Sequence, residues 1–180
     1  MRRFVRFSLI GLIALVGIGF AFNQWVPTDA PTNLKENTPT VSEGQCEADG
    51  VSLLVSFGQD SGLPDISKCV ANYTGTSWDL FSAAGLEVAG TSKYPIGFVC
   101  RIQGFPSEGQ EECRETSNVS VGTWAYFIAQ PGDDSWQYSN WGAATHQVDC
   151  GSAEAWAFKS PNEDLESPPA ERPVTRDCSD

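Results

Sequence analysis

The chain has 180 residues, with 23 acidic side chains against 11 basic ones and a formal net charge of −12 at neutral pH. Such an acidic balance argues against DNA, RNA and anionic membrane surfaces as partners, because each of them needs a basic patch. The six cysteines include no C-x-x-C pair and the chain has one histidine, so disulfides in an oxidising compartment are favoured over zinc.

Residues 1–23 have the charged-then-apolar order of a secretory signal, with three arginines before the apolar run 7–22. The run is shorter than the roughly 20 residues that a membrane-spanning helix needs. Its small-residue cleavage pattern is poor, so a cleaved signal peptide and an uncleaved membrane anchor both remain open. In either case the positive-inside rule places the rest of the chain outside the cytoplasm. Without the three arginines, that part has a net charge of −15.

Composition divides the remaining chain into three parts. Residues 24–44 are rich in proline and threonine without apolar periodicity, which is typical of a linker. Residues 45–158 are long enough for one globular domain. Residues 159–180 form an acidic, proline-rich segment that we expect to be an extended tail. Cys178 lies near its end, which suggests that a disulfide ties the tail to the domain.

Short β-branched or aromatic runs bounded by turn residues predict most of the domain as strands. A capping box at 76–79 predicts the start of one helix, and Gly85 predicts its end. The predicted strands are 51–57, 66–73, 97–102, 123–128, 136–138 and 153–158. We therefore predict an α+β fold, stapled by disulfides, in which one small mixed sheet carries a single packed helix.

Six cysteines allow fifteen pairings. The sequential pairing would close three short loops, each contributing about 3 kcal/mol in the chain-entropy model. Its three bridges are Cys46–Cys69, Cys100–Cys113 and Cys150–Cys178. The second bridge is the firmest prediction, because residues 107–112 look too polar to pack and need a covalent closure.

No catalytic apparatus is evident, so we predict a non-enzymatic protein without a cofactor. Nucleophilic catalysis needs a base beside a nucleophile, and the only histidine, His146, has no such motif around it. The carboxylates lie mostly in turns and in the linker, as solvated acids do. Asp133 and Asp134 lack the oxygen spacing of a calcium loop.

Aromatic side chains are the more informative feature. Three pairs, 124 and 126, 136 and 138, and 156 and 158, are each two residues apart, which places both rings of a pair on one face of a strand. Apolar neighbours favour a core position for Trp124, Trp156 and Phe158. Trp136, Tyr138 and Trp141 have polar neighbours instead. Such neighbours favour a half-exposed platform that stacks on a planar ring or a sugar face. The candidate ligand-binding residues are Trp136, Tyr138, Trp141, Trp124 and Tyr126.

A series of motifs covers residues 46–158: GFVCRIQGFP (97–106), Cys113, GTWAY (122–126), WQYS-x-x-G (136–142) and G-x-x-EAW (151–156). In this order the chain resembles small exported bacterial proteins with a transcobalamin-like C-terminal domain. The resemblance implies a β-grasp-like ligand-binding domain that offers backbone groups and apolar contacts. Cys150 and Cys178 are additional to the family pattern.

Two functions remain open. The first is an extracytoplasmic module that binds a small molecule, which the resemblance would make a cobalamin or corrinoid acting beside a helical partner protein. The second is a carbohydrate- or cell-wall-binding module that uses Trp136, Tyr138 and Trp141 as its platform. Neither function involves nucleic acid, and the membrane is involved only through residues 1–23.

Overall fold

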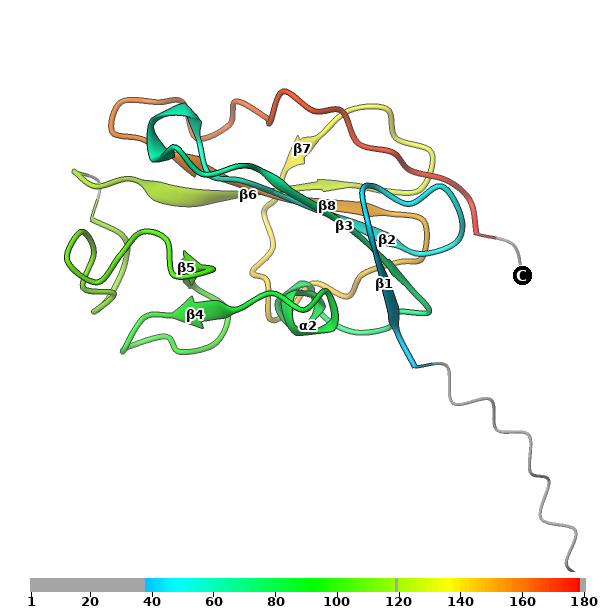
Figure 1. The fold of residues 1–180 in the computed structure, drawn as a ribbon, viewed down its shortest axis with the longest axis horizontal. Coiled ribbons are helices and arrows are strands. Elements are labelled where there is room, and N and C mark those ends of the chain that lie inside the picture. The colour runs from blue at the N-terminus through cyan, green and yellow to red at the C-terminus, as the bar shows by residue number, and fades with distance from the viewer. Residues whose placement is uncertain (1–37, 119, 179–180) are drawn as a thin grey trace, which may run out of the picture. The chain divides into compact units, whose positions relative to one another are not determined.

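A computed structural model describes residues 38–118 and 120–178, so the predictions for residues 1–23 lie outside the described part (Figure 1). The described residues form a six-stranded sheet in the order β1-β3-β2-β8-β6-β7, a two-stranded ribbon β4-β5 and one α-helix. The elements are β1 (Thr40–Glu43), β2 (Val51–Ser56), the 3-10 helix η1 (Gln59–Ser61), β3 (Ile66–Ala71), α2 (Ser77–Ala83), β4 (Val88–Gly90), β5 (Val99–Ile102), β6 (Thr123–Ala129), β7 (Gln137–Tyr138) and β8 (Ala153–Lys159).

The large sheet is mixed. Strand β2 pairs antiparallel with β3 on one side and parallel with β8 on the other, and β8 pairs antiparallel with β6. The two central strands are buried almost throughout because both faces of the sheet are covered. That double burial is why their sequences are nearly continuous in apolar residues instead of alternating with polar ones. The predicted α+β class, with one helix on a mixed sheet, is confirmed at this level.

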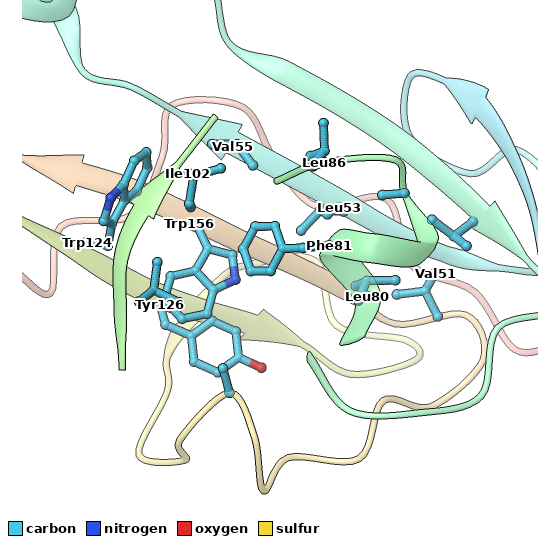
Figure 2. Packing of buried hydrophobic residues seen from close by; sticks show 14 of the residues in the cluster. Val51, Leu53, Val55, Leu80, Phe81, Leu86, Ile102, Trp124, Tyr126 and Trp156 are labelled. Atoms are coloured by element: carbon cyan, nitrogen blue, oxygen red, sulfur yellow. The ribbon is translucent and has the colours of Figure 1, made fainter. Parts of the chain in front are cut away.

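The main core lies between the sheet and α2 (Figure 2). Phe81 of the helix packs on Trp156 of β8 with 5.6 Å between ring centroids. Trp156 in turn stacks on Tyr126 of β6, at 4.5 Å and 9° between the ring planes. Leu80 and Phe81 are completely buried. Burial of each such side chain contributes about 1.5–3 kcal/mol, which exceeds the propensity of so short a helix.

The helix begins and ends as its sequence predicts. Thr76 is the N-cap, and its Oγ1 accepts from the Asp79 amide at 3.2 Å and donates to the Asp79 carboxylate at 2.8 Å. Gly85 follows the helix with φ 73°, a left-handed conformation that favours glycine.

Residues 160–178, which we call the strap, lie over the opposite face of the sheet from α2 (Figure 1). A smaller cluster that includes Leu54, Phe127 and Ala155 fills this face. The strap is fastened by backbone contacts, among them Arg176 N to the Gly151 carbonyl at 2.9 Å. The tail therefore contacts the domain mainly through residues 171–178, while residues 161–168 are exposed.

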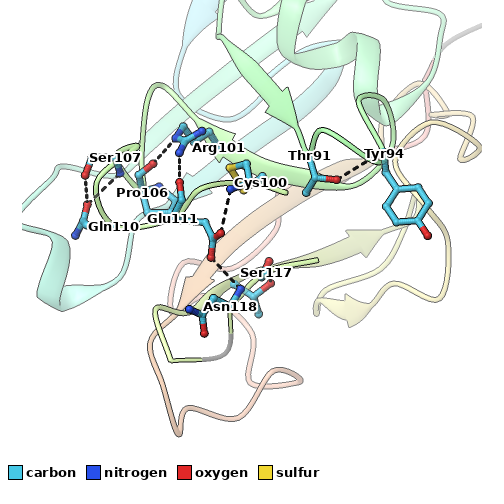
Figure 3. Close-up of a disulfide and its surroundings, with 12 residues drawn as sticks. Thr91, Tyr94, Cys100, Arg101, Pro106, Ser107, Gln110, Glu111, Ser117 and Asn118 are labelled. Atoms are coloured by element: carbon cyan, nitrogen blue, oxygen red, sulfur yellow. Dashed lines mark hydrogen bonds between the residues drawn. A yellow bond between two sulfur atoms is a disulfide. The ribbon is translucent and has the colours of Figure 1, made fainter. Parts of the chain in front are cut away.

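All three disulfides of the sequential pairing are confirmed, with Cα–Cα distances of 4.7, 5.8 and 5.9 Å in chain order. The reason given for the second bridge was incomplete. Glu111 is buried in that loop, where its carboxylate accepts from the amides of Cys113 at 3.0 Å and Asn118 at 2.9 Å (Figure 3). Phe105 also packs edge-on against Phe158 at 4.8 Å. The loop is thus held in place by hydrogen bonds and aromatic packing as well as by the disulfide.

The structure differs from the predicted organisation in three places. Residues 40–43, assigned to the linker, form β1, because their backbone pairs with β3 although their side chains are all exposed. Lys159, assigned to the tail, ends β8. The single predicted sheet is in fact two, because residues 88–90 pair with β5 to form a separate ribbon. Strands β1 and β4 form because they pair with another strand, and neither carries enough apolar pattern to be predicted from its own residues.

Candidate functional site

The five aromatic side chains predicted to bind ligand do not form one surface. Trp124 and Tyr126 are buried in the core between the sheet and α2. Trp136 packs on the strap face and its Nε1 donates to the Glu171 carbonyl at 2.7 Å. Tyr138 packs edge-on against Phe127, which belongs to the same strap-face cluster, at 5.6 Å.

Trp141 is the most exposed of these five rings and lies apart from the rest of the predicted platform. Its side chain is 61 % exposed and stacks on the His146 ring, with 6.4 Å between centroids. His146 in turn lies against Tyr126, on the α2 side of the sheet. The predicted three-ring platform is therefore split between the two faces, since the chain crosses the sheet edge after β7.

Beneath Trp141 is a buried polar cluster that the sequence did not reveal. Glu154 of β8 is 1 % exposed, and its carboxylate accepts a hydrogen bond from the Tyr126 hydroxyl. That hydroxyl also lies 2.5 Å from the Ser77 hydroxyl at the start of α2. The second carboxylate oxygen of Glu154 is 3.3 Å from His146 Nε2, an ion-pair distance without hydrogen-bond alignment.

Electrostatics in this cluster is governed by Glu154. The close contact and charge of its carboxylate raise the pKa of His146 above the ordinary 6.5, against the opposing effect of burial. Burial raises the pKa of Tyr126 strongly and the neighbouring carboxylate raises it further, so the phenol stays protonated. The carboxylate of Glu154 therefore favours the protonated form of His146.

The loop that carries Trp141 and His146 also holds the start of α2. The amides of Ser77 and Trp78 donate to the carbonyls of His146, at 3.1 Å, and Ala143, at 3.0 Å. These contacts satisfy two of the amides that a helix N-terminus leaves free. The loop therefore fixes the position of Trp78.

Trp78 forms one wall of a cleft of about 600 Å³ between α2 and the β4-β5 ribbon. Leu86, Val88 and Ala89 supply further apolar surface, while Arg101, Glu87 and Glu108 supply charge. A concave, mostly apolar site with a few convergent polar groups is the usual form of a small-molecule site, and this volume lies within its ordinary range.

Arg101 is held in a fixed orientation at this cleft. Its Nε donates to the Pro106 carbonyl at 2.6 Å and one terminal nitrogen donates to the Glu111 carbonyl (Figure 3). A guanidinium has five N–H donors in a planar fork, so these two contacts leave donors for a ligand. The arrangement can stack a flat ring on Trp78 and direct a polar group of that ring to Arg101.

Sequence reasoning missed this cleft for identifiable reasons. Trp78 lies inside the capping box, where it was counted as part of a helix signal. The facing ribbon contains β4, which was not predicted. An indole on a helix whose apolar face is already supplied by Leu80, Phe81 and Ala84 was the one available signal.

Comparison with protein-family models, with curated proteins and with solved structures found no match to this chain. Within residues 38–118 and 120–178, no group of three or more histidine, cysteine or acidic side chains is arranged to hold a metal ion. No helix in the same residues combines the length and apolar character needed to cross a membrane. The three disulfides are compatible with an extracytoplasmic location.

Proposed function

We propose that this domain is an extracytoplasmic binding module that takes a small molecule with a flat ring in the cleft between α2 and the β4-β5 ribbon. The observation that carries the proposal is the apolar cleft walled by Trp78, with an oriented Arg101 at its edge. The charged groups of the cleft have structural or solvent-facing roles and imply binding without a reaction.

A β-grasp-like assignment is part of this proposal. Its support is the order of the large sheet, in which a first hairpin is followed by a helix and the last strand returns parallel beside the first strand of the hairpin. The transcobalamin-like resemblance then makes corrinoids the first ligands to test. In that version the module covers one face of the corrinoid and a helical partner protein binds the other.

The experiment is a calorimetric titration of the full chain with cobalamin and with cobinamide, alone and with candidate helical partner proteins. Trp78→Leu should weaken binding by at least about tenfold, because a buried tryptophan contact is commonly worth 2 kcal/mol or more. Arg101→Lys keeps the charge but loses the planar fork, and should also weaken binding. Trp141→Leu is the matched control, since Trp141 lies outside the cleft.

The outcomes separate the levels of the proposal. No heat with either corrinoid in any combination removes the corrinoid version. Equal affinity of Trp78→Leu and the native chain for a ligand that does bind removes the cleft. Loss of binding in the Trp141→Leu control alone would instead place the site outside the cleft, near the exposed rings of Trp141 and Tyr138 that the carbohydrate alternative uses.

A further inference from the structure

A second cleft, of about 710 Å³, lies on the other face of the sheet, between the strap and the segment 56–65 that contains η1. Strand β8 contributes Ala157, Phe158 and Lys159 to it, and the strap contributes residues from Glu163 to Glu171. Nothing in the proposed corrinoid site uses this cleft, because α2 and the β4-β5 ribbon lie on the opposite face (Figure 1).

Lys159 is the unusual residue of this cleft. Its side chain is on the strap face and the residue is only 8 % exposed. Its ammonium lies 5.9 Å from the centroid of the Phe127 ring, yet it has no hydrogen-bond acceptor and no carboxylate partner among residues 38–118 and 120–178. The stem of Lys159 is buried, while its unpaired ammonium is not among the buried side-chain atoms and stays open to the cleft, as the polar ends of long basic side chains usually do.

The rim of the cleft has the opposite charge. Asp60, Asp65, Glu163 and Glu171 line it, and Glu171 accepts a hydrogen bond from the Gln45 side-chain amide at 2.7 Å. One oxygen of each is engaged within the protein: Asp65 accepts from the Phe57 amide at 3.1 Å, and Asp60 and Glu163 accept from the hydroxyl and amide of Ser160. The other oxygen of each carboxylate remains available to a ligand.

These charges select a class of ligand. A simple anion would gain the Lys159 ammonium but meet the repulsion of four carboxylates, and a simple cation would gain the carboxylates but leave the Lys159 ammonium without a partner. A molecule with both charges satisfies both, since its carboxylate can reach Lys159 while its ammonium group pairs with the rim. We propose that this cleft binds a small zwitterion of the amino-acid class, with its carboxylate on Lys159 and its ammonium group on Asp60, Asp65 and Glu163.

The test uses thermal denaturation of the full chain with each common L-amino acid, and with propionate and propylamine as single-charge probes. At least one amino acid at about 10 mM should raise the Tm by about 2 °C or more, as mass action requires of a ligand that binds only the folded state. Propionate and propylamine should leave the Tm unchanged. A Tm that no amino acid raises, or that propionate raises equally, overturns the proposal.

Lys159→Met preserves the length of the side chain and removes its charge. The variant should fold, because it keeps the buried apolar stem and removes only an unpaired charge, and the amino-acid shift should disappear. Lys93→Met is the matched control, since Lys93 is a solvent-exposed lysine paired with Glu115. Asp60→Asn and Glu163→Gln should each weaken binding at least threefold, which keeps the proposal testable if Lys159→Met does not fold. Binding that survives in Lys159→Met, or in both rim variants, refutes the assignment.

Discussion

Replacing Glu154 with glutamine should move the pKa of His146 and change how the stability of the domain depends on pH. In the native chain the close contact and the charge of Glu154 are the main reasons why the pKa of His146 lies above 6.5. Without them, burial remains to lower it, opposed by the more distant charge of Asp149. We expect the pKa of His146 in Glu154→Gln to fall to its ordinary value or below.

The sign of the stability effect follows from linkage. A histidine whose pKa is higher in the folded than in the unfolded state contributes stability that is complete below the unfolded value, and this stability is lost as the pH rises through the folded value. For His146 that loss begins near pH 6.5 and continues upward. Other ionisable groups face the cluster: Tyr73 and Tyr126, whose pKa values are raised, and Asp79 at the start of α2.

The size of the effect can be bounded from the structure. Two unit charges 3.3 Å apart attract by about 5 kcal/mol at an effective dielectric constant of about 20. Desolvation offsets much of this, so Glu154→Gln should lower the free energy of unfolding by about 2 kcal/mol at about pH 5.5. At about pH 9 a smaller fraction of the imidazole is protonated, so the difference should be smaller than at about pH 5.5.

His146 is the only histidine of the chain, so its ring protons give a single, unambiguous titration by NMR. Urea denaturation at the two pH values supplies the free energies. Glu111→Gln is the matched control, because Glu111 is also a buried carboxylate but accepts from backbone amides in another loop. A pKa of His146 that is unchanged in Glu154→Gln, or a stability loss that is equal at both pH values, would refute this reasoning.

Three further predictions concern stability. Replacing Cys100 and Cys113 together by alanine should lower the free energy of unfolding by about 3 kcal/mol in urea, and a loss below about 1 kcal/mol would mean that the other contacts close this loop unaided. Gly151→Ala places a Cβ 1.9 Å from the Arg176 carbonyl oxygen, so Arg176 must move away from residue 151. Hydrogen exchange of the backbone amides in the strap should therefore become faster, and unchanged exchange would contradict this. Phe81→Ala should cost about 3–5 kcal/mol in calorimetry because its ring is completely buried, and a loss under about 2 kcal/mol would show that the core collapses around the gap.

The sequence predicted the elements whose signal is local. Thr76, Asp79 and Gly85 specify the limits of α2 through short-range hydrogen bonds and backbone conformation, and the structure agrees with them. The central strands were found because most of their residues are apolar and turn residues bound them. Strand β1 was missed because its side chains are all exposed, and strand β4 because its three residues are too few to form a pattern.

The candidate sites depended even more on distant contacts. Trp78 becomes a cleft wall only because the unpredicted β4-β5 ribbon lies opposite it. In the sequence Glu154 is only the acidic residue of the G-x-x-EAW motif, and nothing local shows that it is buried beside His146. The aromatic spacing did place Trp124 and Tyr126 on one face of a strand, but that face is the core. Periodicity indicates which residues share a face and leaves open what covers it.

The disulfide between Cys150 and Cys178 joins residues 28 positions apart and encloses the whole strap. Exposed segments with little regular structure are where proteases cut first. A single cut between these two cysteines adds one water molecule to the mass of the chain and releases no fragment, because both new ends stay joined through the sulfur bridge. Proteolysis that would truncate an untied C-terminal segment is thereby reduced to a nick.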